Sequence, residues 1–360
     1  MTLVMSESRD NSRSMSRRAL IGSGIAAVVG GSLLLSRLGR GSGGGGGGSN
    51  LAIQVIDLRP TVPANVESLE YLTPQSDFFL IDTVGKMYPR VAPDDWSLRI
   101  HGMVDREMTL TLADIESMPF IEHVITLGCV SNKVGGDLIG TARWGGVDLA
   151  AVLREAGVRD GAEQLVSRSA DGWTCGTPVS AVLDGRTSML ATHMNGEVLT
   201  GAHGFPVRMV VPGLFGFVSA TKWVTDIEVT TWDAFDPYWL QRGWAREAPM
   251  LASSRIDIPR AKSRHAPGAI TCGGFAWAPR GGVGSVELRV DGGPWSTAEI
   301  LERESGDAWV LWRGKVSVDS GEHFIETRVI DAAGVVQTEE VRDVLPDGAT
   351  GLHGVRIDVD

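Results

Sequence analysis

Six consecutive glycines at positions 43–48 separate a short N-terminal segment from the body of this chain. Glycine has no side chain to bury and loses more conformational freedom on ordering than any other residue. Residues 41–50 are therefore predicted to be a flexible linker, and folding is expected only after them. A G-x-G-x-x-G match within this tract does not indicate dinucleotide binding, because no strand and helix flank it.

The composition fits a folded protein of two domains. The chain has 360 residues and 43% hydrophobic content, enough for two cores. Its net charge of −11 argues against a nucleic-acid partner, because phosphate binding needs a basic face. Three cysteines cannot form a disulfide framework, although a Cys175–Cys272 bridge is conceivable and would leave Cys129 free. The seven histidines lack zinc-binding spacing.

Residues 1–40 are predicted to be an export signal or a membrane anchor. Arg17 and Arg18 precede an apolar stretch ending at Leu35, slightly shorter than the roughly 20 residues that a spanning helix needs. Paired arginines before a mildly apolar region are typical of twin-arginine export signals. A plain signal-anchor helix is the alternative, because no clear cleavage site decides between them. Both interpretations place the body outside the cytoplasm.

Residues 165–259 mix short strands, brief helices and Gly/Pro turns, which predicts that the domain at 51–258 is α+β with an irregular, ligand-holding interior. Residues 96–102 alternate like a strand, and 108–110 like its hairpin partner. Thr111 is placed to cap a short helix. Residues 147–156 are predicted to form an amphipathic helix that Gly157 ends.

Residues 259–360 change in character. Short alternating runs at 269–272, 285–290, 309–312 and 325–330 are separated by turn signals. This pattern is typical of an immunoglobulin-like β-sandwich. Exposed aromatic residues such as Trp295 and Trp312 favour a homodimer, although sandwiches also bury such residues in their own cores.

Cys129 ends an apolar run and opens a glycine-containing loop. A strand that runs into such a loop can present a thiolate at a cleft, and a soft thiolate is a ligand that redox metals prefer. Free cysteines are also commonly buried as small hydrophobic residues. The spacing alone leaves both interpretations open.

The surrounding motifs resemble the sulfite oxidase family of molybdopterin enzymes. From about Thr73 to the C-terminus they follow the order of that family. The matching segments are the molybdenum-ligand region, 129–136 and 140–147, and the cofactor-binding region, 194–199, 203–208, 210–213 and 221–223. The resemblance implies a Mo-molybdopterin cofactor with Cys129 as the metal ligand. It also implies that residues 259–360 are a dimerisation domain.

The same resemblance implies the cofactor contacts. His203 matches a position that hydrogen-bonds the pterin, while Arg208 and Lys222 offer the cations that a phosphate-bearing pterin needs. The other implied contacts are the backbone amides of Ala220 and Thr221, a contact at Ser169, and Ser76, Phe79 and Leu80 within the segment 73–80.

The chain departs from the family pattern near the substrate. Sulfite oxidases follow the aromatic pair with Arg-Asn-His, where this chain reads Leu80-Ile81-Asp82. Trp244 replaces the active-site tyrosine and cannot act as a phenolic acid. The anion pocket of the family is only partly kept, and Arg242 is its best remaining cation. Asp82 would add negative charge if it faced the pocket. These changes predict that sulfite is a poor substrate and that a less charged sulfur or nitrogen oxide is preferred.

The sequence therefore predicts an exported or membrane-anchored molybdopterin oxidoreductase acting on a small molecule. It shows no cytochrome-like haem domain, so a separate electron-transfer partner is expected. Oxidation of sulfite and reduction of a sulfoxide or another oxyanion both stay open. The alternative is an anchored extracellular binding protein that has kept the fold without metal chemistry. The joint presence of Cys129, His203, Arg208 and Lys222 argues against it.

Overall fold

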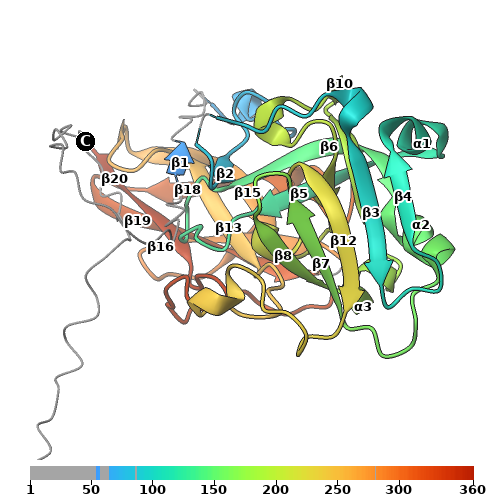
Figure 1. The fold of residues 1–360 in the computed structure, drawn as a ribbon. Helices are drawn as coiled ribbons and strands as arrows, with labels where there is room; N and C mark the ends of the chain where they lie inside the picture. Colours follow the sequence, from blue (N-terminus) through green and yellow to red (C-terminus); the bar gives the residue numbers. More distant parts are fainter. Residues whose placement is uncertain (1–53, 57–64, 86, 280) are drawn as a thin grey trace, which may run out of the picture. The chain divides into compact units, whose positions relative to one another are not determined.

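A computed structural model of the chain describes residues 54–56, 65–85, 87–279 and 281–360. The described residues fall within one compact unit. The predicted export or anchor segment, 1–40, and the predicted linker, 41–50, lie outside them. Within the described ranges, no helix is long and apolar enough to cross a membrane. This part of the chain is mostly β-sheet, with few helices (Figure 1).

A five-stranded sheet has the order β4-β3-β12-β7-β8. Its strands are β3 (Ser97–Gly102), β4 (Met108–Thr111), β7 (Gln164–Ser169), β8 (Thr174–Pro178) and β12 (Val224–Thr230). β3 and β4 form the predicted antiparallel pair. β12 pairs in parallel with β3, with Ile227 opposite Ile100, and antiparallel with β7. The sheet therefore holds the start of β12 beside the end of β7.

A second sheet has the order β10-β9-β6-β5, and β11 also pairs with β9. Its strands are β5 (Phe120–Gly128), β6 (Ile139–Asp148), β9 (Met189–Met194), β10 (Glu197–Val198) and β11 (Arg208–Val210). β5 and β6 are antiparallel from Phe120 opposite Val147 to Gly128 opposite Ile139. Cys129 directly follows β5, and Arg208 begins β11, so one sheet supports both residues.

The helices of the described residues are short. The α-helices are α1 (Leu112–Ser117), α2 (Leu149–Ala156) and α3 (Val179–Leu183), and the 3-10 helices are η1 (Val66–Ser68), η2 (Pro93–Asp95), η3 (Gly201–His203), η4 (Gly216–Val218) and η5 (Leu240–Arg242). Thr111 caps α1 as predicted, because its hydroxyl accepts a hydrogen bond from the backbone N–H of Asp114.

Helix α2 begins later than the sequence predicts. Val147 still belongs to β6 and pairs with Leu190 of β9, so the helix starts at Leu149. The Asp148 side chain accepts from the N–H of Ala150 and caps the helix. Gly157 ends it with a left-handed φ of 73°, as expected of a C-terminal glycine.

The C-terminal strands follow the order β13-β15-β18-β17-β16-β19-β20-β14. Their bounds are β13 (Ser253–Ile258), β14 (Arg264–His265), β15 (Gly268–Trp277), β16 (Val283–Val290), β17 (Ser296–Glu302), β18 (Val310–Val318), β19 (Gly321–Asp331) and β20 (His353–Val359). Three of the four predicted runs fall within β15, β16 and β19, and the fourth, 309–312, begins one residue before β18. β13 pairs with β15, so this set of strands includes residues before 259. A separate small sheet joins β1 (Gln54–Ile56) to β2 (Leu80–Asp82).

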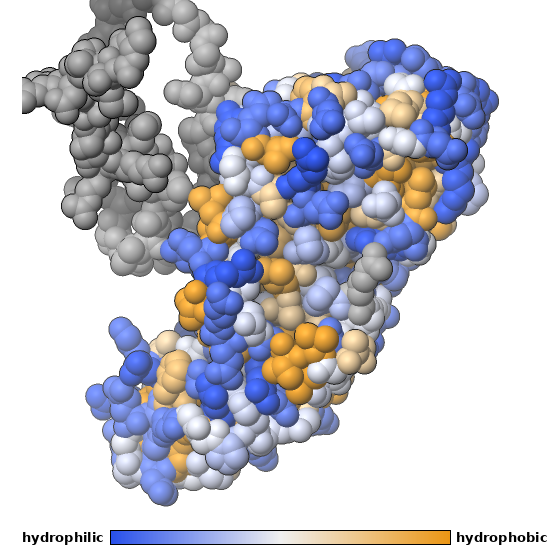
Figure 2. Space-filling view, turned by 90° about the horizontal axis from the view of Figure 1, so that it is seen from below, coloured by the Kyte–Doolittle hydropathy of each residue, from blue (hydrophilic) through white to orange (hydrophobic). Residues whose placement is uncertain are grey.

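The expectation that Trp312 is exposed is wrong. Its side chain is completely buried in the C-terminal core, because strand alternation directs it inward and turns Arg313 outward. Trp295 is partly exposed, and its ring contacts the guanidinium groups of Arg289 and Arg328 at 4.4 and 4.2 Å. The face in Figure 2 is largely hydrophilic, with apolar residues in separate small areas.

The loop between β17 and β18 is bound to the N-terminal sheets. The Trp309 indole N–H donates to the Tyr71 carbonyl at 2.9 Å, and its backbone N–H donates to the Thr126 hydroxyl at 2.7 Å. The backbone N–H of Glu304 donates to the Tyr71 hydroxyl at 2.9 Å. Thr126 lies in β5, so these bonds join the C-terminal strands to the strand that leads into Cys129.

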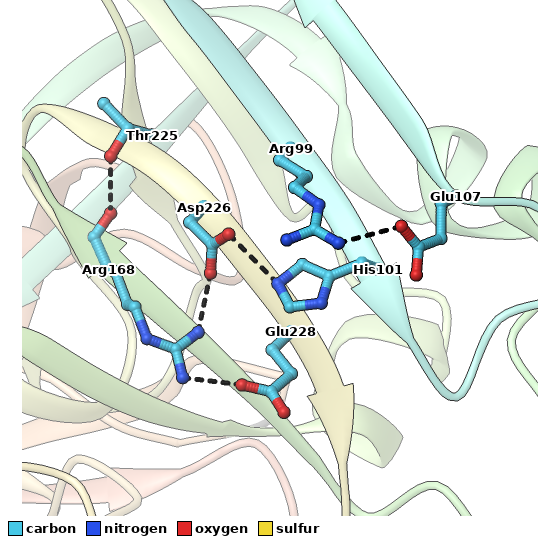
Figure 3. A network of polar contacts seen from close by, with 7 residues as sticks. All are labelled: Arg99, His101, Glu107, Arg168, Thr225, Asp226 and Glu228. Atoms are coloured by element: carbon cyan, nitrogen blue, oxygen red, sulfur yellow. Dashed lines mark hydrogen bonds and ion pairs between the residues drawn. The ribbon is translucent and has the colours of Figure 1, made fainter.

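A charged network covers one face of the five-stranded sheet (Figure 3). The Arg168 guanidinium donates to Asp226 and to Glu228, each at 2.6 Å. The second oxygen of Asp226 lies 3.0 Å from His101 Nε2. The network joins β3, β7 and β12 across the surface of this sheet.

Candidate active site

Cys129 is held by a turn at the end of β5. Its backbone N–H donates to the Leu138 carbonyl at 2.9 Å, and its own carbonyl accepts from the Asn132 N–H at 3.0 Å. The Ser131 N–H lies 3.4 Å from the sulfur. Burial raises the pKa of the Cys129 thiol, so a metal must displace its proton to bind. All three cysteines are free, and Cys175 and Cys272 are both buried.

Arg208 is a buried cation bonded to backbone groups. Nη1 donates to the His203 carbonyl at 3.2 Å, and Nη2 donates to the Ala220 carbonyl at 3.4 Å. Nε has no hydrogen-bond partner among the described residues. The guanidinium lies 4.8 Å from the ring centre of Trp144. Burial lowers the pKa of Arg208 to about 9. A buried charge of this kind normally needs an anion beside it.

Lys222 is also largely buried, but it has an acidic partner. Its ammonium lies 3.3 Å from Asp82 Oδ2 and also donates to the Ala202 carbonyl at 3.3 Å. Burial lowers the pKa of Lys222 to about 8. The prediction that Asp82 repels a substrate depended on its facing the pocket. Its side chain is 1% exposed and faces Lys222 instead.

His203 ends η3 and is buried. Its Nε2 lies 2.8 Å from the Gln75 carbonyl. Because a carbonyl only accepts, Nε2 carries the proton and Nδ1 is left as an acceptor. Burial, followed by the charge of Arg208, lowers the pKa of His203 to about 4, so the ring is neutral at physiological pH. The Phe78 ring contacts it edge to face, with centroids 6.0 Å apart.

Gly204 allows the two cations to approach each other. Its φ of 104° is a left-handed conformation that favours glycine. A Cβ there would lie 3.0 Å from Arg208 Cβ and 3.1 Å from Lys222 Cα. A side chain at this position would therefore push the segments carrying Arg208 and Lys222 apart.

Ala220 and Thr221 lie in the segment that joins η4 to β12. The Ala220 N–H already donates to the Gly216 carbonyl at 3.0 Å, so this amide is engaged within its own loop. The Thr221 hydroxyl lies 2.6 Å from that of Ser167 in β7. A Cβ on Gly216 would lie 3.7 Å from the Gly128 carbonyl and 3.8 Å from Ala220 Cβ. The loop therefore passes beside the end of β5, where Cys129 is.

The remaining predicted contacts differ in exposure. Ser76 is exposed, and its hydroxyl donates to Asp77 at 2.8 Å. Phe79 is partly exposed and stacks on Phe78, with centroids 5.2 Å apart, while Leu80 is buried in β2. Ser169 is buried at the end of β7, and its hydroxyl has no partner among the described residues.

The residues predicted to contact the substrate, Trp244 and Arg242, have fewer contacts with the predicted cofactor residues. Trp244 packs against Phe217 of η4, with ring centroids 5.8 Å apart, and this helix leads into Ala220. Arg242 is exposed; its guanidinium lies 3.6 Å from the ring centre of Tyr238 and donates to the Tyr238 carbonyl. The described contacts therefore link Trp244 to the site and leave Arg242 at the surface.

Three residues of the site were not among the predicted contacts. Trp144 and Phe78 form the aromatic wall, with centroids 5.7 Å apart, and Trp223 donates from its indole to the Gly201 carbonyl at 2.8 Å. Trp223 has a φ of 50°, which is rare for a bulky residue. Each lies inside a segment that matches the family, and this position was the sequence signal that could have identified it as a site residue.

The donor sets that hold metal ions in proteins combine several His, Cys, Asp or Glu side chains. Among the described residues, no group of three or more His, Cys, Asp or Glu side chains is placed to hold an ion. A cavity of about 60 Å³ lies between the segment 132–136 and strands β13 and β15; Gly128 lines it, but Cys129 does not. Two buried donors without partners, Arg208 Nε and the Ser169 hydroxyl, do not belong to the lining of this cavity.

Comparison with known proteins agrees with this chemistry. Residues 85–239 match the model of the oxidoreductase molybdopterin binding domain. Sulfite oxidase of Gallus gallus is 30% identical over 331 residues, covering 78% of this chain and 71% of the relative. Sulfite oxidase of Arabidopsis thaliana is 30% identical over 310 residues, covering 69% and 78%. The chain spans 63% of the human mitochondrial sulfite oxidase, to which it is 28% identical.

The fold has a solved counterpart. The sulfane dehydrogenase SoxCD from Paracoccus pantotrophus superposes with a TM-score of 0.70 over 87% of this chain and 91% of that chain, at 24% identity. Fold and matched domain define an oxidoreductase that binds molybdopterin. The chain belongs to the sulfite oxidase family. A binding protein without catalysis is not favoured.

The residues present fit this cofactor. Arg208 Nε and the Ser169 hydroxyl are buried donors without partners, and Arg208 has no acidic counterpart in its described hydrogen bonds. A phosphate-bearing group would satisfy such donors. The sequence assigned both residues to the cofactor, and their surroundings are compatible with that assignment.

Proposed function

We propose that Cys129 ligates molybdenum in this enzyme and that the site carries out two-electron or oxygen-atom transfer on a small sulfur compound or oxyanion. The observation that carries the proposal is Arg208, a buried guanidinium whose described hydrogen bonds go only to carbonyls. Bound molybdopterin supplies the redox chemistry at the metal. The protein contributes binding, orientation and charge.

Each protein group has a distinct part in this proposal. Arg208 and Lys222 bind the phosphate end of the cofactor, since both are buried cations beside Gly204. Neutral His203 offers Nδ1 as an acceptor, and its Nε2–H is held by Gln75. The Cys129 thiol loses its proton on binding metal. Ser76, Phe79, Leu80, Ser169, Ala220 and Thr221 complete the proposed cofactor contacts.

We further propose that sulfite is a poor substrate. The Asp82 charge no longer supports this, because Lys222 pairs with it. Support comes from Trp244, which replaces an acidic phenol, and from the exposed position of Arg242. With fewer cations at the metal, a dianion gains less than a neutral sulfoxide or nitrogen oxide. Trp244 is proposed to contact the substrate, and Arg242 to attract it at the surface.

The proposal extends to the domain organisation of the chain. Residues 51–258 are proposed to form an α+β domain that holds the cofactor. Residues 259–360 are proposed to form an immunoglobulin-like dimerisation domain. The second assignment is supported by one core to which seven of the eight strands contribute, all except β14. Export or membrane anchoring through residues 1–40 and a separate electron acceptor or donor complete the proposal. Light scattering of the intact chain at micromolar concentration tests the dimer, and a monomeric mass would contradict it.

Metal analysis tests the central proposal. The purified protein is expected to contain molybdenum, and Cys129→Ser is expected to lose turnover while keeping its fold. Kinetics with sulfite and with neutral sulfoxides, using an artificial redox dye in each direction, then test the substrate class. A specificity constant for sulfite above about 10⁵ M⁻¹s⁻¹ would contradict the substrate proposal.

A further inference from the structure

Asp82 is the acidic side chain that pairs with Lys222 in the candidate site. The Asp82 side chain is 1% exposed, and the Lys222 side chain is 11% exposed. Asp82 stands where the sequence departs from the family pattern, and the matched motifs assign it no contact. A buried carboxylate this close to Lys222 either stabilises the charged ammonium or repels the cofactor phosphate that the ammonium would bind.

The two oxygens of Asp82 have different partners. Oδ1 accepts from the backbone N–H groups of Val84 and Gly85 at 3.1 and 2.7 Å. Oδ2 faces the Lys222 ammonium at 3.3 Å. Because the turn 82–85 fixes one oxygen, the direction of the other is also fixed. The neighbouring Thr83 hydroxyl donates to Asp171 at 2.7 Å and holds the same turn.

The Lys222 ammonium is held from two sides. It donates to Asp82 Oδ2 and to the Ala202 carbonyl, and an ammonium has three N–H donors. One donor is therefore left for a further acceptor. The ammonium also lies 4.6 Å from the ring centre of Trp223, which limits its movement.

The charges around Lys222 come from several elements. Burial lowers its pKa, Asp82 opposes this most strongly, and Arg208 adds to it. Besides Asp82 and Lys222 themselves, the titratable or charged groups that face this pair are Tyr88, Asp171, His203 of η3 and Arg208 of β11. The burial penalty and the charge of Arg208 both disfavour the charged form of Lys222, so removal of Asp82 favours a neutral lysine.

We propose that Asp82 is a positioning residue that keeps the Lys222 ammonium charged and in place for the phosphate end of the cofactor. This inference rests on the proposed role of Lys222 in binding molybdopterin. The direct contact between Oδ2 and the ammonium favours support over repulsion, because the carboxylate is turned toward the cation and away from solvent.

Asp82→Asn separates the two functions of the carboxylate. The amide oxygen can still accept from Val84 and Gly85, while the amide nitrogen replaces the oxygen that faces Lys222. The rate of molybdenum loss is measured on purified holoenzyme by elemental analysis after gel filtration, at about pH 6.5 and about pH 8.5. At the higher pH the variant is expected to lose metal about tenfold faster than the wild type, because more of its Lys222 is neutral there. At the lower pH the difference is expected to be small.

Further variants show whether Asp82 acts through Lys222. In a Lys222→Met background, Asp82→Asn is expected to add no further loss. Asp82→Asn combined with Lys222→Arg is expected to retain metal at the higher pH, because a guanidinium stays charged. In Asp82→Ser the hydroxyl can still accept a hydrogen bond from the N–H groups of the turn. If Asp82→Asn does not fold, Asp82→Ser replaces it, with the same expected result.

Asp226→Asn is the matched control. Asp226 also forms an ion pair, with Arg168 on β7, but it belongs to the surface network of Figure 3. This variant is expected to lose molybdenum at the wild-type rate. The inference would be overturned, with the proposed function unaffected, if Asp82→Asn lost molybdenum no faster than the wild type. The same holds if Asp82→Asn accelerated the loss equally in the Lys222→Met background. A wild-type protein that contains no molybdenum would contradict the proposed function as well.

Discussion

The hydroxyl oxygens of Ser167 and Thr221 lie 2.6 Å apart, and both side chains are completely buried. Ser167 belongs to β7, whereas Thr221 belongs to the segment that carries the proposed cofactor contacts. The Thr177 hydroxyl of β8 donates to the Val218 carbonyl at 2.7 Å, in the same region. The five-stranded sheet therefore holds this segment through side-chain hydroxyl groups.

Thr221→Val is predicted to weaken this attachment. The substitution keeps the shape but leaves the Ser167 hydroxyl buried without that partner, at a cost of about 1–3 kcal/mol in the free energy of unfolding. Urea unfolding of cofactor-free protein measures it. Adding Ser167→Ala to Thr221→Val is expected to recover part of the loss, because both partners are then apolar. Full additivity of the two substitutions would contradict the coupling.

Cys129→Ser is predicted to abolish turnover and reduce bound molybdenum while leaving the unfolding midpoint nearly unchanged. Serine is close in size, but a neutral hydroxyl is a poorer ligand than a thiolate for a soft metal. Cys272→Ala, in the C-terminal core, is the control and should retain the metal. Wild-type turnover in the Cys129 variant would show that another residue ligates molybdenum.

Arg208→Met is predicted to change stability and cofactor content in opposite directions. Without cofactor, the buried guanidinium lacks an acidic partner in its described bonds, so an apolar side chain of similar length should raise the free energy of unfolding by about 1–4 kcal/mol. The same variant should purify with little molybdenum. A destabilised cofactor-free variant would mean that the backbone contacts of Arg208 matter more than its burial.

His203 predicts a pH dependence of stability. Its pKa is lowered to about 4 in the folded protein, mainly by burial, against about 6.5 when unfolded. Between these values only the unfolded chain takes up the proton, so stability is complete above about pH 6.5 and falls as the pH drops toward 4. The total effect is about 3 kcal/mol.

His203→Gln is expected to remove this part of the pH dependence, which urea unfolding at about pH 7 and about pH 4.5 measures. His323 provides a control of opposite sign. Its pKa is raised by its hydrogen bond to Asp291, so its contribution is present at low pH and is lost as the pH rises. If both glutamine variants steepened the acid loss, the assignment for His203 would be wrong.

Local structure was the most predictable from sequence. The β3–β4 hairpin and the Thr111 cap depend on neighbouring residues, so alternation and a single hydroxyl are sufficient signals. The start of α2 was misjudged because Val147 fits a strand and a helix equally well by hydropathy. Its pairing with Leu190 decides the outcome, and that partner is distant in the sequence.

The site was predictable where motifs carry it and unpredictable where distant segments meet. Cys129 and Arg208 stand in matched segments, and their surroundings are compatible with a cofactor. No local pattern shows that Asp82 meets Lys222, because β2 and the segment before β12 are brought together only by the fold. For the same reason, Trp312 looked exposed on its strand although a second layer covers it.

The bonds that Trp309 and Glu304 make to Tyr71 and Thr126 mean that the C-terminal strands are not a detachable module. A chain cut directly after β17 would lack Glu304 and Trp309, and would leave the Tyr71 carbonyl and the Thr126 hydroxyl without the indole and backbone N–H that bond them. Catalytic failure of such a truncated chain would therefore report a loosened β5 and a misplaced thiol as readily as a lost subunit contact. Assembly and catalysis are best dissected here by point substitution, not by domain deletion.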